Sequence, residues 1–147
     1  MYEKKYDIVV IGAGHAGIEA ALISDFLGVS VAIITMDINA IARMSCNPAI
    51  GGLAKGQMVR EIDVLGGVMA ETADVSGLQF KTLNKSKGRA VWSPRAQVDK
   101  RLYEKIIRKR VNNSSVSVIQ SEATAVSIKN NKVKGVLLRS GEKIKCL

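Results

Sequence analysis

Two short apolar runs stand near the start of the chain, Ile8 to Ile11 and Val29 to Ile34. Such runs, rich in β-branched residues, are typical of parallel strands buried on both faces. Between them, residues 18–23 are helix formers, and Gly28 predicts the end of that helix. The order strand, helix, strand predicts a βαβ unit, and therefore an α/β fold with a parallel sheet.

Further along, the pattern predicts two more helices. The first is expected from about Ala54 to Leu65, with Val59, Ile62 and Leu65 facing inward. The second runs from Arg95 to about Val111, because Pro94 suits a first helical turn and apolar residues recur at helical spacing. Its apolar stripe consists of Val98, Leu102, Ile106 and Val111, with Ile107 beside it.

The last third of the chain predicts strands. Val116 to Gln120 is expected to be a third parallel strand. Three further strands, at residues 122–129, 133–139 and 142–147, are separated by turns and are typical of a small antiparallel β-meander. Gly77 to Asn84 is expected to form an irregular or strand-like link.

A glycine-spaced motif lies between the first strand and the first helix: Gly12, Ala13, Gly14, His15, Ala16 and Gly17. In a dinucleotide-binding turn, Gly12 allows the sharp bend, Gly14 lets the backbone approach a pyrophosphate, and Gly17 lets the helix pack on the strand. The surrounding strand and helix favour this interpretation over a glycine-rich turn that only packs. His15 is expected to be neutral and to donate or accept a hydrogen bond near the phosphates.

The end of the second strand departs from the usual dinucleotide-binding pattern. An acidic residue is expected there to hold the adenosine ribose, but Thr35 occupies the position and the nearest carboxylate is Asp37. Thr35 can still make a hydrogen bond to the ribose, with Asp37 as a substitute.

Composition narrows the class of protein. The chain has 147 residues and 47% apolar content, which is enough for one domain with a core but too short for a second full domain. No apolar stretch is long enough for a membrane span and no secretion signal is evident, so a cytoplasmic protein is expected. Cys46 and Cys146 lie far apart, and with a single histidine they predict no metal site.

The net charge of +9 is concentrated in one segment. Between Lys81 and Arg110 stand eleven lysines and arginines but only Asp99 and Glu104 as acids. Such a face attracts polyphosphate or nucleic acid. The same concentration of positive charge is also typical of a solvated helix face that lies beside acidic neighbours.

Several motifs together resemble one family. These are Gly12 to Gly17, the run Ser45-Cys46-Asn47-Pro48-Ala49-Ile50-Gly51-Gly52, Lys55-Gly56, Val59 to Asp63, Leu65-Gly66-Gly67 and Arg95-Ala96-Gln97. They resemble the N-terminal part of the MnmG (GidA) family of tRNA uridine 5-carboxymethylaminomethyl modification enzymes. The resemblance extends over nearly the whole chain, and the run from Ser45 is its most specific part.

The resemblance implies a truncated FAD-binding Rossmann-type sheet of the glutathione-reductase kind, with residues 1–147 as the N-terminal part of an FAD/NAD(P)-binding domain. It implies an enzyme that acts with the GTPase MnmE on C5 of the wobble uridine of tRNA. Methylenetetrahydrofolate would supply the carbon and NADH would reduce the flavin. Members are homodimers and several times longer than this chain, so this segment alone is expected to be inactive.

The resemblance also implies roles for individual residues. Cys46 would be catalytic, since a thiolate can add to C6 of uracil and activate C5; a small, inert side chain in a tight loop is the alternative. The cofactor would be contacted by the glycine motif and by Thr35, Asn47, Gly51, Gly52 and Ala123.

A basic segment with one tryptophan predicts RNA contact. Trp92 stands among Lys87, Arg89 and Arg95, and aromatic planes stack on splayed bases while cations hold the backbone. A buried tryptophan that only packs is the other interpretation. The family usually has proline where Arg89 stands, which changes the expected geometry of this loop.

Two other functions fit the same sequence. One is a different FAD-dependent oxidoreductase in which Cys46 is structural or redox-active. The other is a non-enzymatic tRNA-binding module built on the basic segment, whose binding would be salt-sensitive and independent of flavin.

Overall fold

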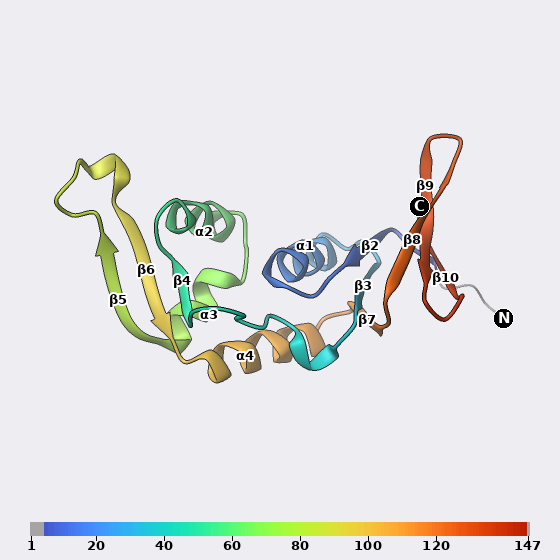
Figure 1. The fold of residues 1–147 in the computed structure, drawn as a ribbon, viewed down its shortest axis with the longest axis horizontal. Coiled ribbons are helices and arrows are strands. Elements are labelled where there is room, and N and C mark those ends of the chain that lie inside the picture. The colour runs from blue at the N-terminus through green and yellow to red at the C-terminus, as the bar shows by residue number, and fades with distance from the viewer. Residues whose placement is uncertain (1–4, 147) are drawn as a thin grey trace. The chain divides into compact units, whose positions relative to one another are not determined.

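The computed structural model describes residues 5–146, which form two compact units (Figure 1). The first unit combines residues 5–42 with residues 110–146, and the second is the continuous segment Arg43–Lys109. Within residues 5–146, every helix is too short or too polar to span a membrane.

A parallel sheet forms the centre of the first unit. Its strands are β2 (Ile8–Ile11), β3 (Val31–Thr35) and β7 (Ser117–Gln120), in the order β2-β3-β7. Helix α1 (His15–Phe26) connects β2 to β3, and every residue of β3 is buried. The predicted βαβ unit and third parallel strand are therefore confirmed, and the strand order is that of a Rossmann half.

A small sheet packs against this parallel sheet. Strands β8 (Ala123–Lys129), β9 (Lys132–Leu138) and β10 (Lys143–Cys146) are antiparallel, and β1 (Lys5–Tyr6) adds to β10 in parallel. Between β8 and β9, Asn130 and Asn131 both have positive φ, as a tight hairpin turn requires. The predicted meander is confirmed. A cluster of Ile34, Val136, Leu138 and Ile144 forms the core between the two sheets.

The second unit is a three-stranded antiparallel sheet with helices. Its strands are β4 (Ala49–Gly51), β5 (Gly77–Leu83) and β6 (Ser93–Val98), in the order β4-β6-β5. The helices are α2 (Lys55–Val64), α3 (Met69–Ser76) and α4 (Lys100–Asn112), the last of which ends in the first unit. The described residues also include two 3₁₀ turns, η1 (Ile38–Ala40) in the first unit and η2 (Arg89–Val91) in the second.

The helix expected from Arg95 is wrong at its start. Residues 93–98 form β6, since the fixed φ of Pro94 suits extended backbone as well as a helix. The helix begins after Asp99, whose Oδ1 accepts hydrogen bonds from the backbone N–H groups of Arg101 (2.9 Å) and Leu102 (3.0 Å). The residues that α4 buries are Tyr103, Ile107 and Val111, whereas Leu102 is 39% exposed.

Helix α3 and strand β4 have no counterpart in the sequence prediction. Helix α3 buries Thr72, Ala73 and Ser76, which are too small and polar to give an apolar period. Strand β4 lies in the run from Ser45 to Gly52, where no strand is predicted, and it is only three residues long. Leu65, expected to face inward, follows the end of α2 and is 75% exposed.

Asp7 joins β1 to β2 and pairs with Ser30. Its Oδ2 accepts hydrogen bonds from the Ser30 N–H (2.8 Å) and the Ser30 hydroxyl (2.6 Å). Both bonds hold the pKa of Asp7 below its ordinary value, and the bond from the Ser30 hydroxyl has the larger effect. Because the folded-state pKa is depressed, the stabilisation is complete above the unfolded-state value of about 3.9 and is lost as the pH falls through the folded-state pKa.

We therefore expect Asp7→Asn to lower the urea midpoint at pH 7, and to lower it less at pH 3, where the wild-type carboxylate is being protonated. Urea unfolding at the two pH values measures this difference. Asp74→Asn is the matched control, because the Asp74 side chain is exposed and makes no hydrogen bond within residues 5–146. An Asp7→Asn midpoint equal to wild type at pH 7 would contradict the stabilising role.

Candidate cofactor and RNA sites

The predicted phosphate loop follows β2 directly. Gly12 has a φ of +101°, a conformation that favours glycine, and its N–H donates to the Ile34 carbonyl of β3 (2.8 Å). Gly14 is the N-cap of α1 and has extended backbone, with φ −73° and ψ −179°. The chain thus turns at Gly12 and enters the helix at His15.

Gly17 and Gly14 are required for different physical reasons. A Cβ on Gly17 would lie 2.0 Å from the Gly12 carbonyl oxygen and 3.3 Å from Val10 Cγ1, so the first turn of α1 lies directly on the loop. A Cβ on Gly14 would have no atom within 4 Å. Gly14 therefore borders open space at the helix N-terminus.

This open space suits an anion. Gly14 has no side chain to cap α1, and the first N–H groups of any helix lack an intrahelical acceptor. Ala13 is buried, and its carbonyl accepts a hydrogen bond from Ala42 N–H (2.9 Å), which holds the loop in place. Ala16 is exposed and His15 is half-buried at the helix start. The residues present fit a pyrophosphate bound by backbone donors.

Thr35 lies at the carboxyl end of β3, beside the end of β2, where a ribose contact is expected. Its hydroxyl donates to the Asp37 carbonyl (3.2 Å), and Asp37 Oδ1 accepts from Asn39 N–H (2.8 Å) to cap η1. Both side chains thus hold the turn after β3. Ala123 begins β8 and packs against the core cluster of the first unit.

The segment that contains Cys46 lies in the second unit, before β4. Cys46 is an exposed free thiol and Asn47 is also exposed. The backbone around them is fixed, because the Asn47 carbonyl accepts from Ala49 N–H and the Pro48 carbonyl accepts from Val98 N–H, each at 2.8 Å. The thiol is therefore presented on an anchored loop.

Gly51 and Gly52 follow at the end of β4, with φ values of +85° and +104°. A Cβ on Gly51 would lie 2.4 Å from the Pro94 carbonyl oxygen, whereas a Cβ on Gly52 would have no atom within 4 Å. Gly52 N–H also donates to that same carbonyl (2.8 Å). Gly51 thus allows close packing on β6, whereas Gly52 is itself buried but has free space where a side chain would begin.

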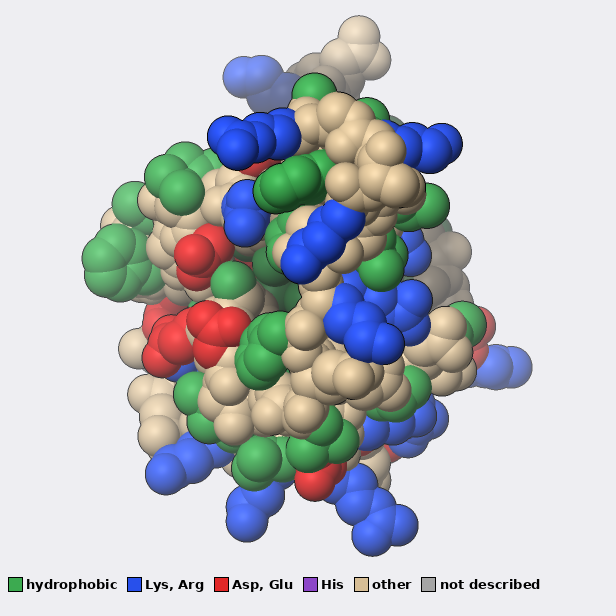
Figure 2. Space-filling view, turned by 90° about the vertical axis from the view of Figure 1, so that its left-hand side faces the viewer, with side chains coloured by type: hydrophobic (Ala, Val, Ile, Leu, Met, Phe, Trp, Pro, Cys, Tyr) green, Lys and Arg blue, Asp and Glu red, His purple; other side chains and the backbone are tan. Residues whose placement is uncertain are grey.

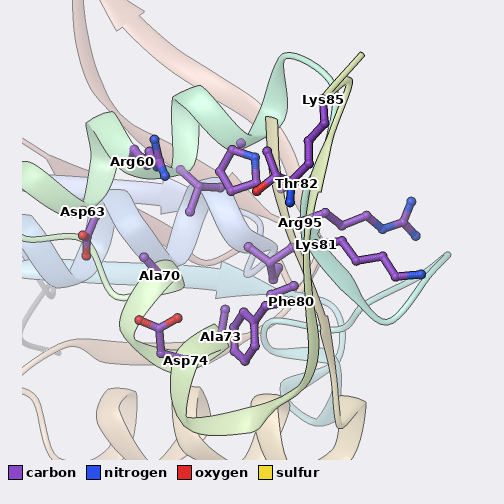
Figure 3. Close-up of a pocket in the computed structure, with 16 residues that line it drawn as sticks. Arg60, Asp63, Ala70, Ala73, Asp74, Phe80, Lys81, Thr82, Lys85 and Arg95 are labelled. Carbon is purple, nitrogen blue, oxygen red and sulfur yellow. The ribbon is translucent and has the colours of Figure 1, made fainter. Parts of the chain in front are cut away.

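A cavity of about 590 Å³ lies within the second unit, between the sheet and helices α2 and α3 (Figure 3). Gly51 and Arg95, which are register partners on β4 and β6, both line it. Phe80, a residue that is 59% exposed, also borders the cavity on the helix side of the sheet.

The three residues predicted to contact RNA belong to one hairpin of the second unit. Lys87 and Arg89 are exposed in the loop between β5 and β6, and Arg95 is half-buried on β6. In Figure 2, Lys and Arg side chains gather over this hairpin. Trp92 is 38% exposed, so it is not the fully buried packing residue of the second interpretation.

The sequence did not indicate that Lys81 lies beside Arg95 on a neighbouring strand. The two residues are directly opposite on β5 and β6. Period-two alternation in residues 77–83 places Lys81 on one face of a strand, but the sequence predicts a helix from Arg95 and so offers no strand for Lys81 to face. In the part of the chain described, no group of three or more histidine, cysteine, aspartate or glutamate side chains could hold a metal ion.

The parallel sheet in the order β2-β3-β7, the glycine loop before α1 and the attached meander define a Rossmann-type dinucleotide-binding fold. Residues 7–147 match the family model described as glucose inhibited division protein A. The chain belongs to this family, also called GidA or MnmG.

Relatives in this family are close in sequence and structure. The chain is 53% identical over 143 residues to the tRNA uridine 5-carboxymethylaminomethyl modification enzyme MnmG of Endomicrobium trichonymphae, covering 97% of this chain and 24% of that protein. The same enzyme of Sulfurihydrogenibium sp. is 53% identical, with 99% and 24% covered. The Aquifex aeolicus GidA structure has a TM-score of 0.92 at 48% identity, with 97% and 24% covered. The chain thus spans about a quarter of the length of these relatives.

Proposed function

We propose that this chain is the FAD-binding part of an enzyme that adds a carboxymethylaminomethyl-type group to C5 of the wobble uridine of tRNA. The observation that carries the proposal is the family match over residues 7–147, at about half identity to proteins named for this activity. The proposed partner is the GTPase MnmE, with NADH as reductant and methylenetetrahydrofolate as carbon source. We expect a homodimer in the cytoplasm.

The glycine loop supports FAD as the cofactor. Gly12 to Gly17 would hold the pyrophosphate at the start of α1, where Gly14 borders open space. Thr35 would lie near the adenosine ribose, Ala123 near the adenine, and Asn47, Gly51 and Gly52 towards the flavin. FAD, when bound, supplies two-electron redox chemistry.

Cys46 is the proposed nucleophile of the chain. Its thiol is free and exposed on a loop held by two backbone hydrogen bonds, which suits attack on a bound base. Attack of the thiolate on C6 of uracil forms a carbon–sulfur bond and moves electron density to C5. The activated C5 can then bond to an electrophilic one-carbon unit, and loss of the C5 proton and of the thiolate restores the ring.

The experiment is deletion of the gene that encodes this chain, followed by mass spectrometry of the tRNA. The modified wobble uridine should disappear and return when the gene is restored. A gene carrying Cys46→Ala should fail to restore the modification, whereas Cys146→Ala, at the other free cysteine, should restore it. Unchanged wobble uridine after deletion would favour a different FAD-dependent oxidoreductase.

A further inference from the structure

Glu104 on α4 is one of the two acids in the basic segment, and its side chain holds a distant backbone group. Its Oε1 accepts a hydrogen bond from the N–H of Met44 (3.1 Å), which lies 60 residues earlier in the chain. Both residues belong to the second unit. The bond therefore fastens the segment before β4 to α4, and no local pattern in the sequence indicates it.

Met44 needs an acceptor from elsewhere in the fold. Residues 43–48 lie outside the helices and strands, so neither a helical turn nor a neighbouring strand accepts this N–H. Met44 is only 4% exposed, which leaves little access for water. A buried N–H without a partner is unfavourable, and an ionised acceptor makes a stronger hydrogen bond than a neutral one. The Glu104 carboxylate thus satisfies a backbone group that local structure leaves unpaired.

The Glu104 carboxylate is not taken up by cations on its own helix. Lys100, Arg101 and Arg108 stand three or four positions away on α4, where an ion pair with Glu104 could form. Arg108 instead donates from Nε to the Glu104 backbone carbonyl (3.4 Å). Among the residues that the structure describes, Glu104 makes no ion pair, and the bond from Met44 is the hydrogen bond that its side chain makes.

Helix α4 gives Glu104 a rigid support. Tyr103, the residue before it, and Ile107, three positions after it, are both 0% exposed. The start of the helix is fixed by the cap at Asp99. A carboxylate carried on a well-packed helix holds its oxygens within a narrow range of positions, which is what a positioning group requires.

Cys46 lies midway between two points at which its loop is attached. Met44, two residues before it, is held by Glu104. Pro48, two residues after it, accepts a hydrogen bond at its carbonyl from the N–H of Val98 in β6 (2.8 Å). The attachment at Pro48 joins two backbone groups, whereas the attachment at Met44 depends on one side chain. Loss of that side chain would loosen the loop before the thiol while the attachment after it stays intact.

We propose that Glu104 is a positioning residue for the Cys46 thiol, because it holds the Met44 backbone and thereby fixes the loop that presents the thiol to a bound base. This inference rests on the proposed function, in which Cys46 is the nucleophile. Attack requires close alignment of the reacting atoms, and a displacement of about 1 Å can lower the rate by about 100-fold. In this role Glu104 acts through the loop and touches no reacting atom.

Deuterium exchange of the Met44 amide, followed by nuclear magnetic resonance of the purified chain, measures the attachment directly. Glu104→Ala should speed this exchange by about 10- to 150-fold, the range for loss of one hydrogen bond to a charged group. Glu104→Gln keeps an oxygen acceptor at the same reach and should retain most of the protection. Glu104→Asp keeps the charge, but its side chain is one methylene shorter, so it should lose the protection.

A nitroxide label on Cys46, in a Cys146→Ala background, reports on the position of the thiol. Its electron paramagnetic resonance lines should narrow in Glu104→Ala, because the loop moves more freely, and should remain broad in Glu104→Gln. Glu61→Ala is the matched control, since the Glu61 side chain is exposed on α2 of the same unit and makes no hydrogen bond within residues 5–146. A general loss of stability would instead speed the exchange of amides throughout the chain, including those of β3.

The modified wobble uridine is the functional readout. After gene deletion, a gene carrying Glu104→Gln should restore the modification, and one carrying Glu104→Ala should restore it poorly. Wild-type Met44 exchange in Glu104→Ala would overturn the proposal, and so would full restoration by a Glu104→Ala protein whose Met44 amide exchanges fast. Either result leaves the proposed function standing. If deletion of the wild-type gene leaves the uridine unchanged, the proposed function falls and the positioning role falls with it.

Discussion

A Gly14→Val variant should lose FAD affinity by about 100-fold or more while remaining folded. Gly14 borders open space at the N-terminus of α1, and a branched side chain there would occupy the position proposed for the pyrophosphate. Loss of two charge-assisted hydrogen bonds, each contributing about 1.5–3 kcal/mol, accounts for an effect of this size. The fold should survive because φ −73° and ψ −179° are ordinary extended values for valine.

Visible absorbance and flavin fluorescence of the purified protein titrated with FAD measure this effect, and circular dichroism checks the fold. Gly14→Ala is the graded control, since one methyl group fills less of the space and should cost less affinity. Wild-type FAD binding by a folded Gly14→Val protein would show that the pyrophosphate does not lie at this loop.

Gly17→Ala should instead destabilise the protein, by about 3 kcal/mol. The new Cβ would stand 2.0 Å from the Gly12 carbonyl oxygen, a backbone atom that no side-chain rotation can move aside. Relief requires α1 to move off β2, and overpacking of this kind costs about 1–3 kcal/mol and occasionally more. In a chain of 147 residues each kcal/mol lowers Tm by roughly 2–4 °C, so a fall of about 6–12 °C is expected.

Thermal unfolding followed by circular dichroism measures this change. Gly14→Ala again serves as the control, because it is the same chemical change three residues earlier in the same loop, where the new methyl group points into open space. Its Tm should stay near wild type or rise slightly, since alanine restricts the unfolded chain. Equal Tm values for Gly17→Ala and wild type would mean that α1 does not pack on the loop as described.

The first half of the first unit could be predicted from sequence because every local signal agrees there. An unbroken apolar run gives β2, glycine spacing gives the turn, and Gly28 ends the helix with a φ of +80°. The structure also explains why the phosphate-loop motif has glycine at two of its positions. Gly12 has a positive φ, and Gly17 lies against the backbone of Gly12.

The second unit was harder to predict because its local signals conflict. Residues 95–98 continue the helical apolar period of α4, but they pair with β5 and β4 as a strand. That pairing depends on Gly51 and Gly56, which leave room for Pro94 about 40 residues along the chain, a contact that no local window contains. The N-cap at Asp99 was the available signal for the true helix start. The roles of Cys46 and of the cofactor residues stay predictions.

The division of the chain into one interrupted and one continuous unit bears on how the protein is made. Strand β3 cannot complete its pairing until β7 has been synthesised, because Ala32 pairs with Ser117. In the same way, Lys5 of β1 cannot pair until Lys145 of β10 has been synthesised. Residues 43–109, by contrast, have all their strand partners within one stretch. During synthesis the nascent chain therefore carries β2 and β3 as an apolar, half-paired sheet with an open edge until residue 120 has left the ribosome. An unpaired apolar sheet edge of this kind exposes the growing chain to aggregation or chaperone capture at this stage.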